Sequence, residues 1–209
     1  MNDRVNIRAN TKSIGRRKMV HGAGLNDSIC KISQKINGKK AICQYYRKWA
    51  DMLNRCYNPK FQERDPTYIG VTVCEEWLTF SRFKSWMETQ DWEGMELDKD
   101  IIKPGNKMYS PETCCFVPRA LNGLLNDRGS ARGDCPRGVT FYQSKYIARC
   151  GFNGKNKYLG LFSTPEEASL VYRKFKANLV AEIAFEQTDE RIERGLMLHA
   201  ALILKGDLN

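Results

Sequence analysis

Hydrophobic residues follow a helical period in the first half of the chain. Between residues 43 and 57 the apolar positions recur every three or four residues, which predicts an amphipathic helix that ends at Asn58-Pro59. These positions are Tyr45, Trp49, Met52, Leu53 and Cys56. Residues 68 to 74 are rich in β-branched side chains and predict a short strand. Residues 75 to 87 return to the helical period and predict a helix with an aromatic face.

A polar turn interrupts the pattern between residues 95 and 118. The segment predicts a strand, the turn and a second strand, which opens a helix over residues 119 to 126. Residues 127 to 134 are small, polar and glycine-containing, which is typical of a linker between domains.

Beyond the linker the period becomes two. Three short strands are predicted over residues 138–142, 145–152 and 157–162, with Asn153-Gly154 as a hairpin signal. Thr164, Pro165 and Glu167 then form a capping box that begins a helix reaching about residue 186. A last helix, over about residues 189 to 204, has an apolar side that either packs back on the core or forms a dimer seam.

These elements predict an α+β fold in several parts. A central strand–strand–helix module with flanking helices precedes a small three-stranded antiparallel sheet packed on a long helix. The expected parts are a basic N-terminal arm over 1–40, the central module over 41–126, the linker over 127–134, the sheet-and-helix domain over 135–186 and a C-terminal helix over 187–209.

The charge of the chain indicates a polyanionic partner. Thirty-four Lys and Arg residues against 24 Asp and Glu give a formal charge of +10, which favours nucleic acid first and an acidic membrane second. A merely basic, solvated surface is the alternative. In the same way, the cations of residues 1 to 40 either lie on phosphates or form a solvated tail.

The sequence predicts no membrane span. It has no run of about 18 apolar residues, and residues 1 to 14 lack the apolar segment of a signal peptide. We therefore expect a cytoplasmic protein whose eight cysteines are reduced thiols, core residues or metal ligands.

The face of the predicted C-terminal sheet opposite the helix is expected to be basic. It would carry five cations with two tyrosines between them, and a ribbon of this kind fits the major groove of DNA. These residues are Arg137, Lys145, Arg149, Lys155 and Lys157, with Tyr142 and Tyr146.

Four stretches of the C-terminal region carry a family resemblance. They are Arg137-Gly138-Val139, Lys145-Tyr146-Ile147-Ala148, Tyr158-Leu159-Gly160-Leu161-Phe162 and Thr164-Pro165-Glu166-Glu167-Ala168, followed by Tyr172. Over residues 135 to 184 this pattern resembles the DNA-binding domain of plant ethylene-response factors, the Apetala-two type, which places its sheet in the major groove. The resemblance implies that the residues facing DNA are Thr140, Tyr142, Lys145, Arg149 and Tyr158. Thr140 and Arg149-Cys150-Gly151 depart from the family's usual residues, so its base preference does not transfer.

The central region carries a second resemblance. The residues concerned are Trp49, Arg55-Cys56-Tyr57, Gly70 to Leu78, Phe80, Phe83, Leu97-Asp98-Lys99-Asp100, Asn106, Tyr109 to Cys114 and Asn122. Over residues 43 to 126 they resemble phage-encoded HNH-type proteins, homing endonucleases among them, which often join a degenerate HNH module to an Apetala-two-type domain in this order. The resemblance implies a ββα module of the His-Me finger kind and, for a phage protein, a location in the host cytoplasm.

An HNH module holds one divalent ion, and the resemblance assigns its residues here. Asp98 on the first strand and Asn122 on the helix would hold Mg²⁺ or Mn²⁺, and Asn106 would pin the hairpin. Lys99 falls near the position of the general base, where a protonated ammonium suits phosphate binding better than proton abstraction. Asp100 or Glu96 could act as the base through a water. Since no histidine lies between His21 and His199, the sequence predicts no local imidazole.

Cysteines suggest a second metal site. Cys56, Cys74 and Cys114 fall at a helix end, a strand end and the hairpin end, and together with His21 they would make a structural Zn²⁺ site. Cys43 or Cys115 could replace His21 as the fourth ligand. The alternative is buried free thiols, because the spacings are long and no CxxC occurs.

Three functions remain open from the sequence. The first is a metal-dependent HNH endonuclease that nicks or cuts double-stranded DNA. The second is a catalytically inactive DNA-binding protein, such as a regulator or a factor directed at host DNA. The third is a protein-binding inhibitor built on the same modules. The oligomeric state stays open as well, with the C-terminal helix as the candidate dimer seam.

Overall fold

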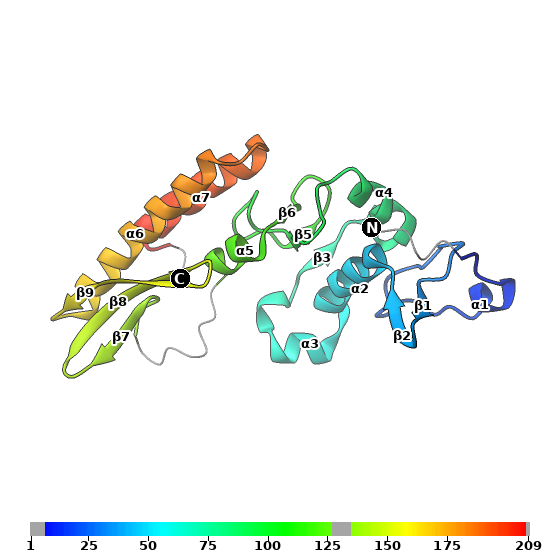
Figure 1. Ribbon diagram of the computed structural model, residues 1–209, viewed down its shortest axis with the longest axis horizontal. Helices are drawn as coiled ribbons and strands as arrows, with labels where there is room; N and C mark the ends of the chain where they lie inside the picture. Colours follow the sequence, from blue (N-terminus) through cyan, green and yellow to red (C-terminus); the bar gives the residue numbers. More distant parts are fainter. Residues whose placement is uncertain (1–6, 127–134, 208–209) are drawn as a thin grey trace. The chain divides into compact units, whose positions relative to one another are not determined.

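The computed structural model of the chain describes residues 7–126 and 135–207 (Figure 1). The predicted linker over 127–134 and the first six residues of the predicted arm lie outside the described residues. The chain divides into two compact units. Unit 1 comprises residues 1–92 and 107–114, and unit 2 comprises residues 93–106 and 115–209. The central module predicted over 41–126 therefore contributes to both units, and the predicted sheet-and-helix domain is part of unit 2.

Residues 7 to 42 form defined elements, although their sequence shows no clear period. Helix α1 (Thr11–Gly15) begins at Asn10, whose side chain accepts a hydrogen bond from the Ser13 N–H. Strands β1 (Ser33–Ile36) and β2 (Lys39–Ile42) pair antiparallel around Asn37-Gly38. Both turn residues have positive φ, at 50° and 74°, as a two-residue hairpin turn requires.

The predicted helix over 43–57 is confirmed as α2 (Gln44–Tyr57). It is followed by α3 (Pro59–Arg64) and the 3₁₀-helix η1 (Pro66–Tyr68). The predicted strand over 68–74 is reduced to β3 (Thr72–Val73), which pairs in parallel with β5 (Met108–Tyr109). The predicted helix over 75–87 is broken at Thr79, in extended conformation, into the 3₁₀-helix η2 (Glu75–Leu78) and α4 (Phe80–Glu88).

Large aromatic residues form the core of unit 1. The side chains of Trp49, Trp77 and Phe83 are at most 1% exposed. The indole of Trp49 donates a hydrogen bond of 2.7 Å to the carbonyl of Trp77, which satisfies its buried polar group. The aromatic face predicted for residues 75 to 87 therefore belongs to the core of unit 1.

Unit 2 begins with a wide hairpin. Strand β4 (Glu96–Asp98) pairs antiparallel with β6 (Cys115–Val117), and helix α5 (Arg119–Leu125) follows directly. All three residues of β6 are buried.

The predicted three-stranded antiparallel sheet is confirmed. Its strands are β7 (Val139–Tyr142), β8 (Lys145–Phe152) and β9 (Lys155–Phe162), with β8 in the middle. A bulge interrupts the pairing of β8 with β9 beside Ala148 and Arg149. Gln143-Ser144 and Asn153-Gly154 make the turns, and all four residues have positive φ.

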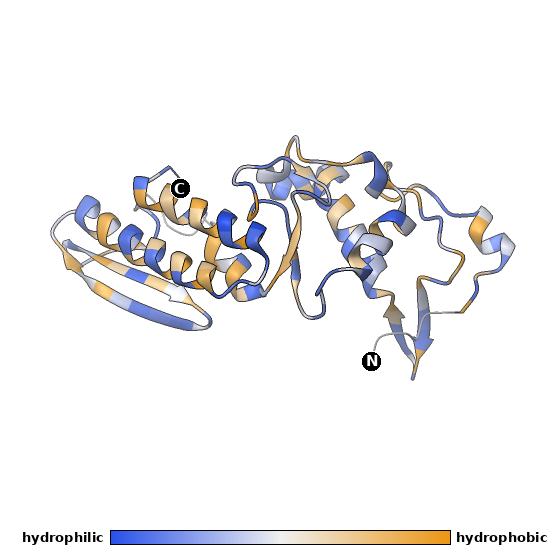
Figure 2. Cartoon of the chain, turned by 90° about the horizontal axis from the view of Figure 1, so that it is seen from above, coloured by the Kyte–Doolittle hydropathy of each residue, from blue (hydrophilic) through white to orange (hydrophobic). Residues whose placement is uncertain are grey.

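Two long helices complete unit 2. Helix α6 (Pro165–Phe185) begins with the predicted capping box, in which Thr164 and Glu167 bind each other's backbone N–H groups. Helix α7 (Glu190–Lys205) packs along α6, so its apolar side joins the core, the first of the two predicted alternatives. Hydrophilic and hydrophobic residues are mixed along both helices (Figure 2), and α6 packs against the sheet as well as against α7. No helix in residues 7–126 and 135–207 combines the length and the apolar character that crossing a membrane requires.

Gly195 allows α7 to approach the turn after β4. A Cβ placed on Gly195 would lie 2.2 Å from the carbonyl oxygen of Ile101 and 2.9 Å from the Cα of Ile102. Both atoms belong to the backbone, so they cannot rotate away as a flexible side chain could.

We expect Gly195→Ala to lower the free energy of unfolding by about 1–3 kcal/mol, because the helix and the turn must separate to admit the methyl group. Urea unfolding followed by circular dichroism measures this. Gly123→Ala in α5 is the matched control, since its Cβ would meet no atom within 4 Å. Alanine there should be neutral or stabilising by up to about 1 kcal/mol. Equal effects at the two positions would contradict the close approach.

Candidate functional site

Asp98 closes the turn that follows β4. Its Oδ1 accepts hydrogen bonds from the N–H groups of Asp100 (2.7 Å) and Ile101 (2.8 Å). Burial raises the pKa of Asp98, and the two N–H donors oppose that rise. One oxygen of this predicted metal ligand is thus engaged by the local backbone.

Lys99 and Asn106 bind each other across the loop between β4 and β5. The buried ammonium of Lys99 donates to Asp100 Oδ2 (2.6 Å) and to the Asn106 carbonyl (2.8 Å). In return, the Asn106 Nδ2 donates to the Lys99 carbonyl (2.9 Å). Since an ammonium is well bound here as a cation, Lys99 has the contacts of a loop anchor rather than of a base.

Asn122 contacts Glu96 instead of Asp98. Its Nδ2 donates to Glu96 Oε2 (2.7 Å), and its Oδ1 accepts from the Asn126 side chain (2.7 Å). Arg119 lies 3.7 Å from the other Glu96 oxygen and is mostly exposed. The carboxylate nearest to the predicted helix ligand is therefore Glu96, two residues before Asp98 on β4 and on the same face of that strand.

His199 brings an imidazole to this turn, so the prediction of no local imidazole is wrong. Its Nε2 lies 3.0 Å from the carbonyl oxygen of Asp100, although the two residues are 99 positions apart. Burial lowers the pKa of His199, and its contact with Asp100 opposes that change. Only the packing of α7 creates the contact, and no local spacing in the sequence signals it.

The part of the chain that the structure describes holds no group of three or more His, Cys, Asp or Glu side chains arranged to bind a metal ion. Asp98 and Asn122 have different hydrogen-bond partners, the backbone of the turn and the Glu96 carboxylate respectively. Cys56 and Cys114 are buried, Cys74 is half-buried, and none of the three belongs to a disulfide, while His21 is exposed. The Mg²⁺, Mn²⁺ and Zn²⁺ sites stay predictions.

The outward face of the C-terminal sheet carries all five residues that the Apetala-two resemblance places on DNA. Residues directly opposite in an antiparallel pair share a face. Tyr142 lies opposite Lys145, Arg149 opposite Tyr158, and Thr140 opposite Ile147. Every one of them except the half-buried Ile147 is exposed. Residues 135 to 165 contain no Asp or Glu, so no carboxylate from these strands neutralises this face.

Three residues expected on this face lie on the other. Lys155 pairs with Phe152 and Lys157 with Cys150, and both partners belong to the face that packs on the core. Tyr146 also belongs to that face, where its ring contacts the Phe141 ring at a tilt of 55°, with the ring centroids 5.1 Å apart. Lys155 and Lys157 take their register from the Asn153-Gly154 turn, which sets them opposite Phe152 and Cys150. Tyr146 lies on the opposite face from its neighbour Lys145, because side chains alternate along a strand.

Arg137 lies at the end of α5. Its guanidinium donates to the carbonyls of Leu124 (3.1 Å), Leu125 and Asn126, which are left without helical partners at the C-terminus of the helix. Arg137 thereby ties α5 to the start of β7, a role that the sequence did not indicate.

No protein-family model matches this chain, and the searches of curated proteins and of solved structures give no match either. The resemblances to HNH-type and Apetala-two-type proteins therefore stay predictions based on the residues quoted above.

We expect acid to destabilise the protein partly through His199. Because burial lowers its pKa in the folded state, the unfolded chain takes up the proton first. The stability that neutral His199 contributes is complete above the ordinary value of 6.5 and is lost as the pH falls toward the lowered folded pKa. His199→Gln keeps a donor for the Asp100 carbonyl but cannot titrate, so its stability should fall less between neutral pH and about pH 5.

Thermal unfolding across this pH range measures the difference between the two proteins. His21→Gln is the matched control, because His21 is exposed and is the other of the two histidines in the chain. If the unfolding temperatures of the wild-type protein and His199→Gln fall in parallel with pH, His199 is not a source of the acid sensitivity.

Proposed function

We propose that this chain is a double-stranded DNA-binding protein that docks the outward face of β7, β8 and β9 in the major groove. The observation that carries the proposal is the combination of Lys145 and Arg149 with three further exposed polar side chains on a face without carboxylates. A three-stranded sheet presenting Arg, Lys and Tyr offers both phosphate contacts and base contacts. Helix α6 packs on the opposite face, so the docking face needs no rearrangement to meet DNA.

Arg149 is the residue that we expect to read a base. It lies in the central strand beside the bulge, which turns the local backbone, and its neighbour Tyr158 is 54% exposed. An arginine contacting a guanine edge contributes about 1–3 kcal/mol of discrimination against the wrong base.

Selection from a pool of random duplexes tests this proposal. The wild-type protein should enrich a defined sequence, and Arg149→Ala should bind that sequence about tenfold or more weakly. Lys157→Ala removes the same charge from the same sheet but on the other face, so it should keep the sequence preference. A gel shift that is absent, or insensitive to salt, would contradict DNA binding altogether.

A metal-dependent endonuclease is the second candidate function. One observation favours it: β4 pairs with β6, α5 follows β6, and the Glu96 carboxylate on β4 lies 2.7 Å from the Asn122 amide on α5. The bound states of Asp98, Lys99 and Asn122 weigh against it, because each side chain already has an intramolecular partner. The geometry therefore supports DNA binding better than DNA cleavage.

Nicking of supercoiled plasmid in Mg²⁺ or Mn²⁺ separates the two functions. If Glu96, Asp98 and Asn122 belong to a site that cleaves DNA, the variants Asp98→Asn and Asn122→Ala should lose the metal-dependent nicking of the wild-type protein. Asparagine at position 98 keeps an oxygen to accept the two N–H groups of the turn, so the loss would reflect chemistry rather than unfolding. Absence of nicking by the wild-type protein, or nicking unchanged in both variants, removes the endonuclease.

A further inference from the structure

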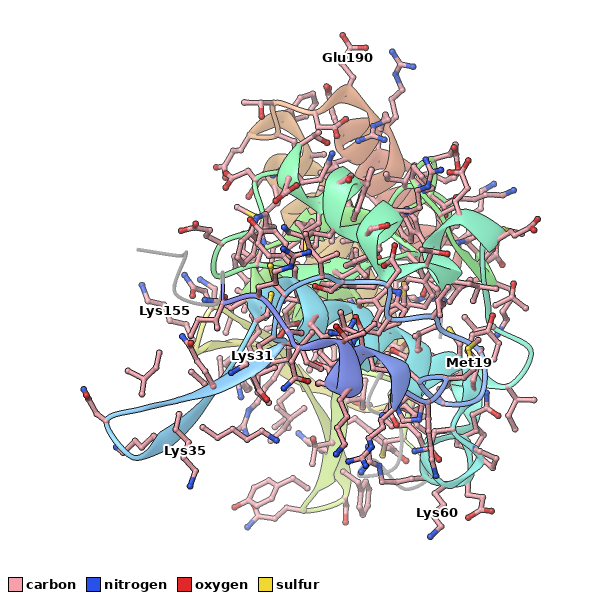
Figure 3. All side chains as sticks on the ribbon, turned by 90° about the vertical axis from the view of Figure 1, so that its right-hand side faces the viewer. Met19, Lys31, Lys35, Lys60, Lys155 and Glu190 are labelled. Carbon is pink, nitrogen blue, oxygen red and sulfur yellow. The ribbon has the colours of Figure 1, made fainter. Side chains whose placement is uncertain are left out.

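Unit 1 carries its own row of cations on the ribbon of β1 and β2. The pairing places Lys35 directly opposite Lys40, and Ile36 opposite Lys39. All three lysines are exposed, and Lys31 and Lys35 are labelled beside the ribbon in Figure 3. Two like charges directly opposite destabilise an antiparallel pair, and an isolated two-stranded ribbon is only marginally stable.

The sequence around this ribbon carries no carboxylate. Residues 28 to 50 contain four lysines before α2 and two further cations within it, and they contain no Asp or Glu. An anion lying between Lys35 and Lys40 would replace their repulsion with two attractive contacts. The ribbon is thus suited to a polyanion and unsuited to an apolar or basic partner.

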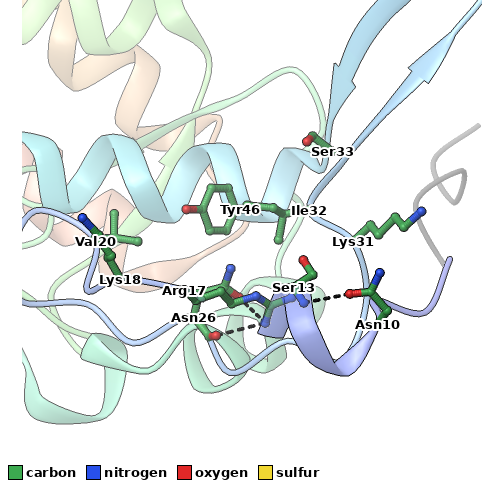
Figure 4. A pocket seen from close by; sticks show the side chains of 10 residues that line it. All are labelled: Asn10, Ser13, Arg17, Lys18, Val20, Asn26, Lys31, Ile32, Ser33 and Tyr46. Carbon is green, nitrogen blue, oxygen red and sulfur yellow. Dashed lines mark hydrogen bonds between the residues drawn. The ribbon is translucent and has the colours of Figure 1, made fainter. Parts of the chain in front are cut away.

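A pocket with a mixed polar and apolar lining lies at the base of the same ribbon (Figure 4). Three cations line it, Arg17, Lys18 and Lys31, and no carboxylate does. The Arg17 guanidinium donates to the carbonyls of Asn26, Ser28 and Cys30, which fix its position without neutralising its charge. Within residues 7–126 and 135–207, neither Lys18 nor Lys31 forms an ion pair.

The pocket and the ribbon present one continuous face. Ser33 lines the pocket and lies two positions before Lys35, so both side chains point to the same side of β1. From Lys31 to Lys35 an extended chain covers about 13 Å, at about 3.3 Å per residue. That length exceeds one phosphate group and matches several successive phosphates of a strand, which advance about 3.4 Å each along the DNA axis.

We propose that this face of unit 1, formed by Lys31, Lys35 and Lys40 with the pocket cations Arg17 and Lys18, is a second binding site for the phosphodiester backbone of double-stranded DNA. The inference rests on the proposed DNA-binding function and extends it from the sheet of unit 2 to a separate surface. The ribbon supplies affinity and salt dependence, whereas the sheet supplies base recognition.

Fluorescence anisotropy with a short duplex over a series of salt concentrations tests the site. The variant Lys31→Gln, Lys35→Gln, Lys40→Gln should reduce the slope of log affinity against log salt by about 2 to 3, because up to three phosphate contacts are lost. Its affinity should fall about equally for all duplex sequences. Arg17 is left intact, since its hydrogen bonds hold the loop of residues 26 to 30.

A matched triple variant controls for net charge. Lys60→Gln, Lys174→Gln, Lys205→Gln removes three exposed lysines from α3, α6 and α7, outside both surfaces, and should leave the slope nearly unchanged. Circular dichroism verifies that both triple variants fold.

The outcomes distinguish the two proposals. If the wild-type protein binds DNA and the ribbon variant keeps the slope of the control, the second site is overturned while the sheet proposal stands. If the wild-type protein does not bind DNA, the proposed function itself fails. If the variant binds a free inorganic phosphate probe as weakly as the wild type does but loses DNA affinity, the ribbon contacts a polymer backbone as proposed.

Discussion

The contact between α7 and the turn after β4 is the constraint on which unit 2 depends. Gly195 lets the helix approach the backbone at Ile101 and Ile102, and one helical turn later His199 meets the carbonyl of Asp100. The same turn is closed from inside by Asp98 and fastened to its loop by Lys99 and Asn106. Asp98, Lys99 and Asn106, which the sequence suggests as catalytic residues, hydrogen-bond within this half-buried turn. An unpaired polar group would destabilise the fold there.

Positive charge in this protein is placed where carboxylates are absent. Residues 28–50 in unit 1 and 135–165 in unit 2 contain no Asp or Glu, and each of these stretches forms an antiparallel ribbon or sheet with exposed cations. A chain with 24 acidic residues could neutralise both surfaces. Leaving them unneutralised costs stability through repulsion, and a polyanionic partner would offset that cost.

Local signals predicted most of the elements, and nonlocal contacts explain the differences. The capping box of Thr164 and Glu167 and the turn at Asn153-Gly154 act within a few residues, so the sequence is sufficient to place them. The helix expected over 75–87 breaks at Thr79, whose neighbour Phe80 donates its N–H to the carbonyl of Leu25, a contact more than fifty residues away. The register of β9 against β8 likewise sets Lys155 and Lys157 opposite Phe152 and Cys150, on the face that packs on the core.

The sequence alone determined the α+β composition, the three-stranded sheet with its long helix, and the basic character of two regions, because these depend on periodicity, capping and charge. Only the tertiary structure decided which residues meet. It paired Asn122 with Glu96, set Arg137 at the end of α5, and brought His199 to Asp100 from 99 residues away. Such contacts arise from the packing of helices and strands on a shared core, and packing depends on shape complementarity between segments that no local pattern encodes.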